Sequence, residues 1–109
     1  MQAWIGDTVV AEADEEQLVR IEGNLYFPPT AVRWDLVDDS ATPYTCPWKG
    51  AAQYWNVTTP AGTHADAAWS YPSPLPTAID HVGIDFGGYV AFDPVQVVLL
   101  ESRADMGLL

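Results

Sequence analysis

The sequence predicts a small, mainly β single domain with one short helix. Its 109 residues are enough for one hydrophobic core and too few for two. Nine prolines and eight glycines are spread along the chain and divide it into short segments, which disfavours long helices. Those segments are rich in Val, Ile, Trp, Tyr and Thr, which pack well on a pleated surface. We therefore expect a sandwich, barrel or folded sheet over residues 1–109, with residues 101–109 as a C-terminal tail.

Short strand patterns and turns alternate in the first half of the chain. A hairpin is expected around Gly6-Asp7, since strand-forming residues flank this two-residue turn. Gln17–Glu22 alternates in polarity, and Gly23-Asn24 is expected to turn the chain into a strand over Leu25–Phe27. Trp34–Val37 has an extended pattern that is expected to end at residues 38–40.

Within the predicted strand Gln17–Glu22, alternate side chains point to opposite faces. Val19 and Ile21 share one face. Leu18, Arg20 and Glu22 share the other.

The second half contains the clearest strand pattern and the one expected helix. Proline residues at the start of Pro74–His81 favour a short helix, because the first helical N–H groups need no intrahelical partner. The expected strands here are Ala51–Thr58, Ala67–Tyr71, Tyr89–Phe92 and Val95–Leu100.

The charge balance excludes several classes of function. The chain has four Lys and Arg residues and fifteen Asp and Glu residues, which gives a net charge of −11. Nucleic acid is recognised by clustered cations, so we expect no nucleic-acid partner, and an anionic membrane is disfavoured for the same reason. The chain shows no signal peptide and no apolar run long enough to span a bilayer, and its single cysteine suits a reducing compartment. We expect an acidic cytoplasmic protein without a cofactor.

The tight turn from Tyr44 to Gly50 is the first candidate site. Cys46 and Lys49 are three residues apart, so the turn could bring the ammonium close to the thiol. A nearby cation stabilises a thiolate, which is how reactive cysteines are made. The alternative is that Cys46 is a small buried apolar residue and Lys49 points to water. Cys46 and Lys49 are therefore the candidate catalytic residues.

Two motifs carry a resemblance to a known family. The segment Thr45–Trp55 resembles the central signature of the family described as domain of unknown function 427, and Asp66–Pro74 resembles its second motif. Further similar segments are Ile21-Glu22, Tyr26–Pro28 and Val90–Phe92. The resemblance covers about residues 4–100.

The resemblance implies a small β-rich fold like that of the Mss4-like or β-tent group. Many β-tent proteins hold a zinc ion with two Cys-x-x-Cys pairs, but this chain has one cysteine and cannot build that site. The family is sometimes labelled a nucleotidyltransferase family. Gly87-Gly88 is too short for a phosphate-binding glycine loop, and adjacent carboxylates such as Asp38-Asp39 point to opposite faces of a strand. These residues do not support that label.

An aromatic set surrounds the two motifs. If the strands over residues 51–58 and 67–71 pair, one aromatic face could fill the core while the other lines a pocket. The alternative is that both faces are covered. The candidate ligand-binding residues are Glu22, Trp48, Lys49, Tyr54, Trp69 and Tyr71.

The histidines carry a weaker signal. His64 and Asp66 would be neighbours on one loop, but nothing in the sequence places them beside Cys46, so we do not expect a catalytic triad. His81 at the end of the predicted helix is favourably placed for the helix dipole. No spacing typical of a metal site is present.

Three functions remain open. The first is a small-molecule binding or sensing domain with a pocket around residues 46–50, preferring an anionic or planar ligand because Lys49 is one of only four cations. The second is an enzyme that uses Cys46 or Lys49 as nucleophile or acid/base. The third is a structural or interaction domain, with a homodimer formed through sheet edges.

Overall fold

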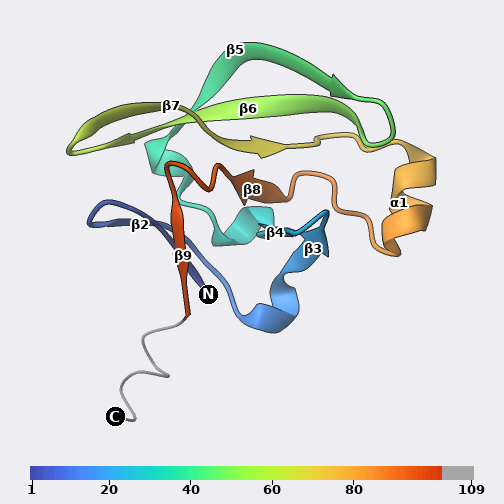
Figure 1. Ribbon diagram of the computed structural model, residues 1–109, viewed down its shortest axis with the longest axis horizontal. Helices are drawn as coiled ribbons and strands as arrows, with labels where there is room; N and C mark the ends of the chain where they lie inside the picture. Colours follow the sequence, from blue (N-terminus) through green and yellow to red (C-terminus); the bar gives the residue numbers. More distant parts are fainter. Residues whose placement is uncertain (102–109) are drawn as a thin grey trace.

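The computed structural model describes residues 1–101 and confirms the mainly β fold, with three antiparallel sheets (Figure 1). The first sheet has the order β2-β1-β9 and contains β1 (Gln2–Ile5), β2 (Thr8–Glu12) and β9 (Val98–Leu100). The second pairs β3 (Val19–Ile21) with β4 (Asn24–Tyr26). The third has the order β5-β6-β7-β8 and contains β5 (Val37–Cys46), β6 (Gly50–Thr59), β7 (Gly62–Ser70) and β8 (Val90–Phe92).

The third sheet covers the other two, and the helix α1 (Pro76–Val82) lies at one end of the molecule beside the β5–β6 turn (Figure 1). Single turns of 3₁₀ helix span Glu15–Gln17, Pro29–Ala31 and Trp34–Leu36. No helix among residues 1–101 is long and apolar enough to cross a membrane. The likeness to the β-tent group stays a prediction.

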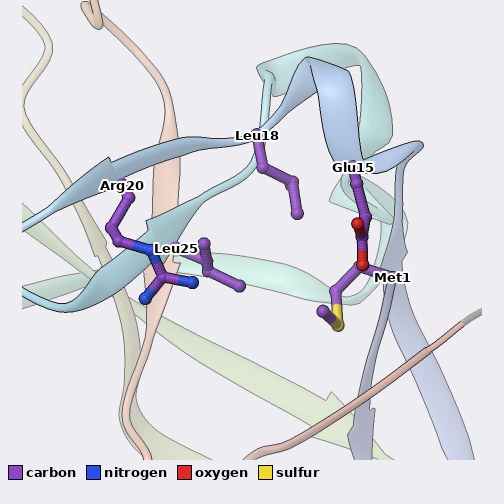
Figure 2. A pocket seen from close by; sticks show the side chains of 5 residues that line it. All are labelled: Met1, Glu15, Leu18, Arg20 and Leu25. Atoms are coloured by element: carbon purple, nitrogen blue, oxygen red, sulfur yellow. The ribbon is translucent and has the colours of Figure 1, made fainter.

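The two N-terminal hairpins have tight turns. The turn at Gly6-Asp7 is confirmed, because Ile5 pairs directly with Thr8. The second turn lies one residue earlier than expected, at Glu22-Gly23, so that Ile21 pairs with Asn24. Both turn residues have positive φ angles, +54° and +83°, which fits the twist of a two-residue hairpin. Figure 2 shows this hairpin from close by, with Arg20 beside Leu25, its partner across the strands.

Three boundary predictions were wrong. Trp34–Val37 is not extended, because Trp34–Leu36 forms a 3₁₀ turn in which the Leu36 amide donates to the Arg33 carbonyl at 3.0 Å. β5 does not end at Ser40 but continues to Cys46, since an irregularity between Asp39 and Pro43 accommodates the proline on this edge strand. The last strand is only Val98–Leu100, because Asp93 accepts backbone hydrogen bonds that close a turn over the preceding residues.

The other predicted elements are confirmed with shifted ends. The predicted strand Ala51–Thr58 is β6, and the predicted strand Ala67–Tyr71 is the end of the longer β7, which stops one residue earlier, at Ser70. The helix begins at Pro76, later than predicted, and ends at Val82; the next residue, Gly83, has a φ of +90° that allows the left-handed cap.

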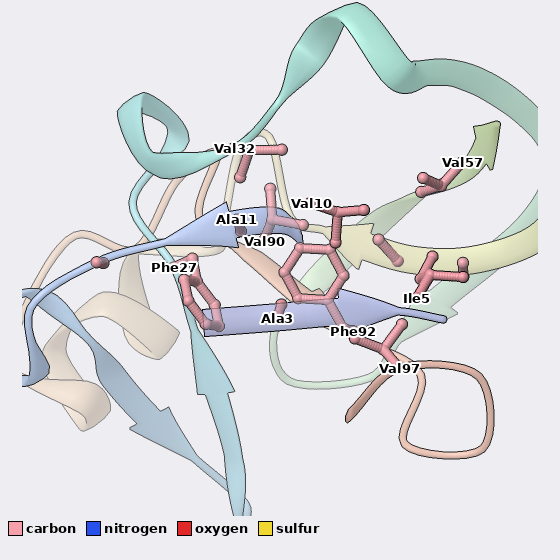
Figure 3. Packing of buried hydrophobic residues seen from close by; sticks show 13 residues of the cluster. Ala3, Ile5, Val10, Ala11, Phe27, Val32, Val57, Val90, Phe92 and Val97 are labelled. Carbon is pink, nitrogen blue, oxygen red and sulfur yellow. The ribbon is translucent and has the colours of Figure 1, made fainter. Parts of the chain in front are cut away.

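Two hydrophobic clusters fill the interior. The larger lies between the sheets and includes Phe27 and Phe92, whose rings meet edge to face at 5.5 Å (Figure 3). The smaller lies near α1 and the β5–β6 turn. It is built from Ile21, Tyr26, Cys46, Tyr71, Ala78, Phe86 and Ala91.

Gly50 begins β6 directly after the β5–β6 turn and has a φ of +108°, outside the left-handed region that other residues tolerate. We predict that Gly50→Ala lowers the free energy of unfolding by at least about 2 kcal/mol. Gly6→Ala is the matched control, because Gly6 has a φ of +56° and open space around it; its cost should be about 1 kcal/mol. Urea denaturation of both variants checks this, and equal costs would contradict it.

Candidate functional site

The candidate site lies where two hairpin turns and the helix meet. Pro47-Trp48-Lys49 closes the β5–β6 hairpin between Cys46 and Gly50, which pair across it. The carbonyl of Lys49 accepts a hydrogen bond from the amide of Leu75 at 3.0 Å, just before α1. This bond fixes the turn against the start of the helix.

Lys49 does not point to water. It is only 5% exposed, and its ammonium donates a hydrogen bond to the carboxylate of Glu22 on the β3–β4 turn. The Nζ atom also lies 4.7 Å from the ring centroid of Trp48 and 5.3 Å from that of Tyr71, within the range of cation–π attraction. The turn therefore holds a cation over an aromatic surface, and the alternative in which Lys49 points to water was wrong.

The surroundings of Lys49 stabilise its charged form. Burial by itself lowers the pKa of a lysine, but the hydrogen bond to Glu22 and the nearby Tyr26 and Cys46 outweigh burial, so the pKa of Lys49 is raised. The hydrogen bond from Lys49 lowers the pKa of Glu22 in turn, against a smaller effect of burial. At neutral pH the pair is an ammonium and a carboxylate.

Glu22 occupies a conformation that is unusual for its residue type. Its φ of +54° is the left-handed region, which Gly and Asn adopt easily and which costs other residues about 1–2 kcal/mol. The side chain of Glu22 is 55% exposed, so one side of the carboxylate faces the ammonium while the rest faces solvent. The turn thus holds an accessible carboxylate over a buried cation.

Cys46 lies in the smaller hydrophobic cluster and is buried. The aromatic hydroxyls around it are also withdrawn from water: burial raises the pKa of Tyr71, and it raises that of Tyr26 as well. The close approach of the Lys49 ammonium to the Cys46 thiol that the spacing suggested stays a prediction. A catalytic role for either residue stays a prediction.

The other aromatic candidates lie on the predicted strand pair, which the structure confirms through the partners Tyr54 and Trp69. Their ring centroids are 6.4 Å apart, and both side chains are half-buried. The Nε1 of Trp69 donates to the hydroxyl of Tyr26 at 3.0 Å, which satisfies its polar atom inside the protein. Tyr71 is buried behind Lys49. A ligand-binding role for Tyr54, Trp69 and Tyr71 stays a prediction.

A hollow of about 230 Å³ opens beside the ion pair. It is lined by Arg20, Ile21, Glu22, Trp48, His81 and Val82. The rings of Trp48 and His81 meet edge to face at 5.4 Å and also line a neighbouring hollow of about 340 Å³ that reaches Thr77 and Ala78 on α1. Two of the sequence-predicted residues, Glu22 and Trp48, therefore line an open depression, while Lys49 lies beneath it.

Sequence reasoning missed Arg20 and His81 as lining residues. Arg20 carried a usable signal, because it is one of only four cations and was expected on the same strand face as Glu22. His81 carried none, since its position depends on how α1 packs against the β5–β6 turn.

His64 and Asp66 lie at the other end of the β6–β7 hairpin. His64 pairs with Val57, seven residues along β6 from Gly50, which is about 23 Å of extended chain. The His64 ring bonds the Thr59 hydroxyl at 3.0 Å instead. Across residues 1–101, no three His, Cys, Asp or Glu side chains gather closely enough to hold a metal ion.

We predict that the ion pair of Lys49 and Glu22 contributes to the free energy of unfolding in a pH-dependent way. Because the pKa of Glu22 is lowered, its contribution is complete above its ordinary value of 4.5 and is lost as pH falls through the folded-state value. Because the pKa of Lys49 is raised, its contribution is complete below 10.5 and is lost as pH rises through its folded-state value. A double-mutant cycle of Glu22→Gln and Lys49→Met should give a coupling energy of about 1–2 kcal/mol at pH 7, reduced because water reaches Glu22.

The same cycle at pH 3 should give a clearly smaller coupling. The fully exposed pair Arg33 and Asp35 is the control, and Arg33→Gln with Asp35→Asn should couple more weakly at pH 7. Urea denaturation at both pH values measures these energies. Equal coupling for the two pairs at pH 7 would contradict the placement of Lys49 as a buried cation.

The comparison with protein-family models gives a match. The model of the family described as "Domain of unknown function (DUF427)" matches residues 1–102. No curated protein matches the sequence. The family model covers almost the whole chain, including both turns that build the ion pair and the helix beside them. The chain therefore belongs to the DUF427 family.

Proposed function

We propose that this protein binds a small, planar, anionic molecule in the hollow between Arg20 and Trp48. The observation that carries the proposal is which lysine and arginine side chains are already paired with a carboxylate. Within residues 1–101, Arg33 is paired with Asp35 and Lys49 with Glu22, whereas no ion pair in that range engages Arg20. Arg20 is exposed and lines the hollow, so it is the cation available to a ligand. A guanidinium favours carboxylate or phosphate oxygens, which it can bind with two parallel hydrogen bonds.

The aromatic residues that line the hollow favour a flat group. Trp48 and His81 present aromatic surface there, and Val82 adds apolar contact. Aromatic walls with a few polar groups are typical of small-molecule sites. A planar ligand would lie against this wall with its anionic substituent at Arg20.

The ion pair adds specificity to this arrangement. Glu22 neutralises Lys49 and keeps its remaining carboxylate surface open to the hollow. A carboxylate accepts hydrogen bonds and repels a second anion, so an N–H or O–H donor on the side of the planar group that faces Glu22 should strengthen binding further. A planar aromatic ring with one anionic substituent is the minimum that the hollow requires.

Binding is better supported than covalent catalysis. The raised pKa of Lys49 favours the protonated ammonium, which cannot act as a nucleophile. The thiol of Cys46 is buried in a hydrophobic cluster, where a substrate would have to displace core side chains. In the proposed site, Lys49 and Cys46 therefore have a supporting role at the floor of the hollow.

Location and assembly belong to the same proposal. A cytoplasmic site of action is supported by the single cysteine, which suits a reducing compartment. A homodimer is supported by the edge strands β5 and β9, each with one unpaired side in the described sheets. Light scattering after size exclusion distinguishes a monomer from a dimer.

The proposal is tested with methyl 1-naphthyl phosphate, a flat probe with one negative charge. Saturable binding, followed by ¹H–¹⁵N shifts that include the Trp48 indole, is expected in the wild type. Arg20→Gln should weaken binding about fivefold, the effect of one solvent-exposed charge contact of about 1 kcal/mol.

Arg33→Gln is the matched control, since it removes the same charge at a paired site outside the hollow. It should leave the dissociation constant unchanged. Absence of saturable binding, or equal weakening in both variants, would overturn the proposal.

A further inference from the structure

A second hollow, of about 250 Å³, lies on the other side of Arg20. It is lined by Met1, Glu15, Leu18, Arg20 and Leu25 (Figure 2). The half-buried side chains of Leu18 and Leu25 provide an apolar surface, with Arg20 at one side and Glu15 and Met1 at the other (Figure 2). Met1 and Leu18 also pack against the larger hydrophobic cluster, which fixes the floor of this hollow in place.

The two hollows meet at Arg20 on the β3 strand. Leu18 and Arg20 are alternate residues of an extended segment and lie on the same face, and Glu22 follows in the β3–β4 turn. Leu18 lines the second hollow, Glu22 lines the first, and Arg20 lines both. At about 3.3 Å per residue, the distance from Leu18 to Glu22 is about 13 Å. The surface is therefore a track with a cation at its centre, an aromatic wall at one end and an apolar hollow at the other.

We propose that the ligand is an extended molecule that fills this whole track. It would have a planar group at Trp48, a single anionic group at Arg20 and an unbranched apolar arm between Leu18 and Leu25. This inference rests on the proposed function, because it uses the same anion position at Arg20. The proposed ligand is an aryl or heteroaryl group joined to an alkyl chain through a monoanionic linker such as a phosphodiester.

The chemistry of the far rim restricts the end of the arm. Glu15 is exposed there and its carboxylate would repel a second anion. The arm should therefore end in an apolar or cationic group. This preference for the end of the arm distinguishes the second hollow from a nonspecific hydrophobic surface, which would accept any alkyl chain equally well.

The test compares two probes with the same charge, methyl 1-naphthyl phosphate and hexyl 1-naphthyl phosphate, by isothermal titration calorimetry. Each fully buried methylene strengthens binding about fourfold, and the hollow is open, so we expect the hexyl probe to bind the wild type about tenfold more tightly. In Leu25→Ala this ratio should fall to about threefold or less. Leu25 is suitable for this variant because it belongs to neither hydrophobic cluster.

Leu99→Ala is the control, since Leu99 is an exposed leucine of β9 outside the track, and it should keep the wild-type ratio. A third probe, 5-carboxypentyl 1-naphthyl phosphate, should bind more weakly than the hexyl probe, and Glu15→Gln should reduce that difference.

The outcomes separate the two proposals. If the methyl probe binds and depends on Arg20 but the hexyl probe gains nothing, the extended ligand is refuted and the proposed function stands. If the hexyl gain is the same in Leu25→Ala and Leu99→Ala, the arm binds elsewhere and the inference is also refuted. If neither probe binds saturably, both proposals fall together.

Discussion

The ion pair between Lys49 and Glu22 is the interaction on which the candidate site depends. It joins the turns of two hairpins that belong to different sheets. Glu22 and Lys49 themselves are 27 positions apart in the chain. A two-stranded hairpin such as β3–β4 is marginally stable by itself, so its position relies on what its ends contact. Glu22 and Lys49 fasten this hairpin to the β5–β6 turn, and the amide of Leu75 fastens the same turn to the start of α1. The hollow beside Trp48 exists because these three elements meet.

Holding Lys49 and Glu22 in this geometry costs folding free energy, and that cost is consistent with a functional surface. A buried ammonium must be compensated, and a backbone of left-handed conformation is unfavourable for glutamate. Asparagine would relieve the backbone at the turn, but its shorter side chain could not reach as far toward the ammonium. Strained backbone conformations cluster at active sites and ligand-binding sites. Among the lysine and arginine side chains of residues 1–101, Arg33 and Lys49 are held in ion pairs and Arg20 is not.

Local patterns in the sequence predicted the mainly β fold and several elements, whereas long-range contacts were not predictable. The alternation over Ala51–Thr58 predicted β6, because the pattern of a strand is carried by its own residues. The hairpin turn at Glu22-Gly23 was misplaced by one residue, since Asn24 is the more usual turn residue and the reason for Glu22 lies in the distant Lys49. Glu22, Trp48 and Lys49 were all named as candidates, yet only the structure shows that Lys49 is buried and that Arg20 and His81 complete the hollow. The position of His81 follows from no local pattern, because it depends on how α1 packs against the β5–β6 turn, whereas Arg20 was at least expected on the same strand face as Glu22.

The central claim is that Lys49 is a buried cation that holds the carboxylate of Glu22 in its ionised form. The most direct measurement is the pKa of Glu22 from the ¹³C chemical shift of its carboxyl group, followed by NMR across acidic pH. In the wild-type protein the pKa of Glu22 should lie below 4.5, because the Lys49 ammonium donates a hydrogen bond to it. In Lys49→Met it should rise to 4.5 or above, while the carboxyl of Asp35 keeps its wild-type value. An unchanged pKa of Glu22 in Lys49→Met would contradict the account.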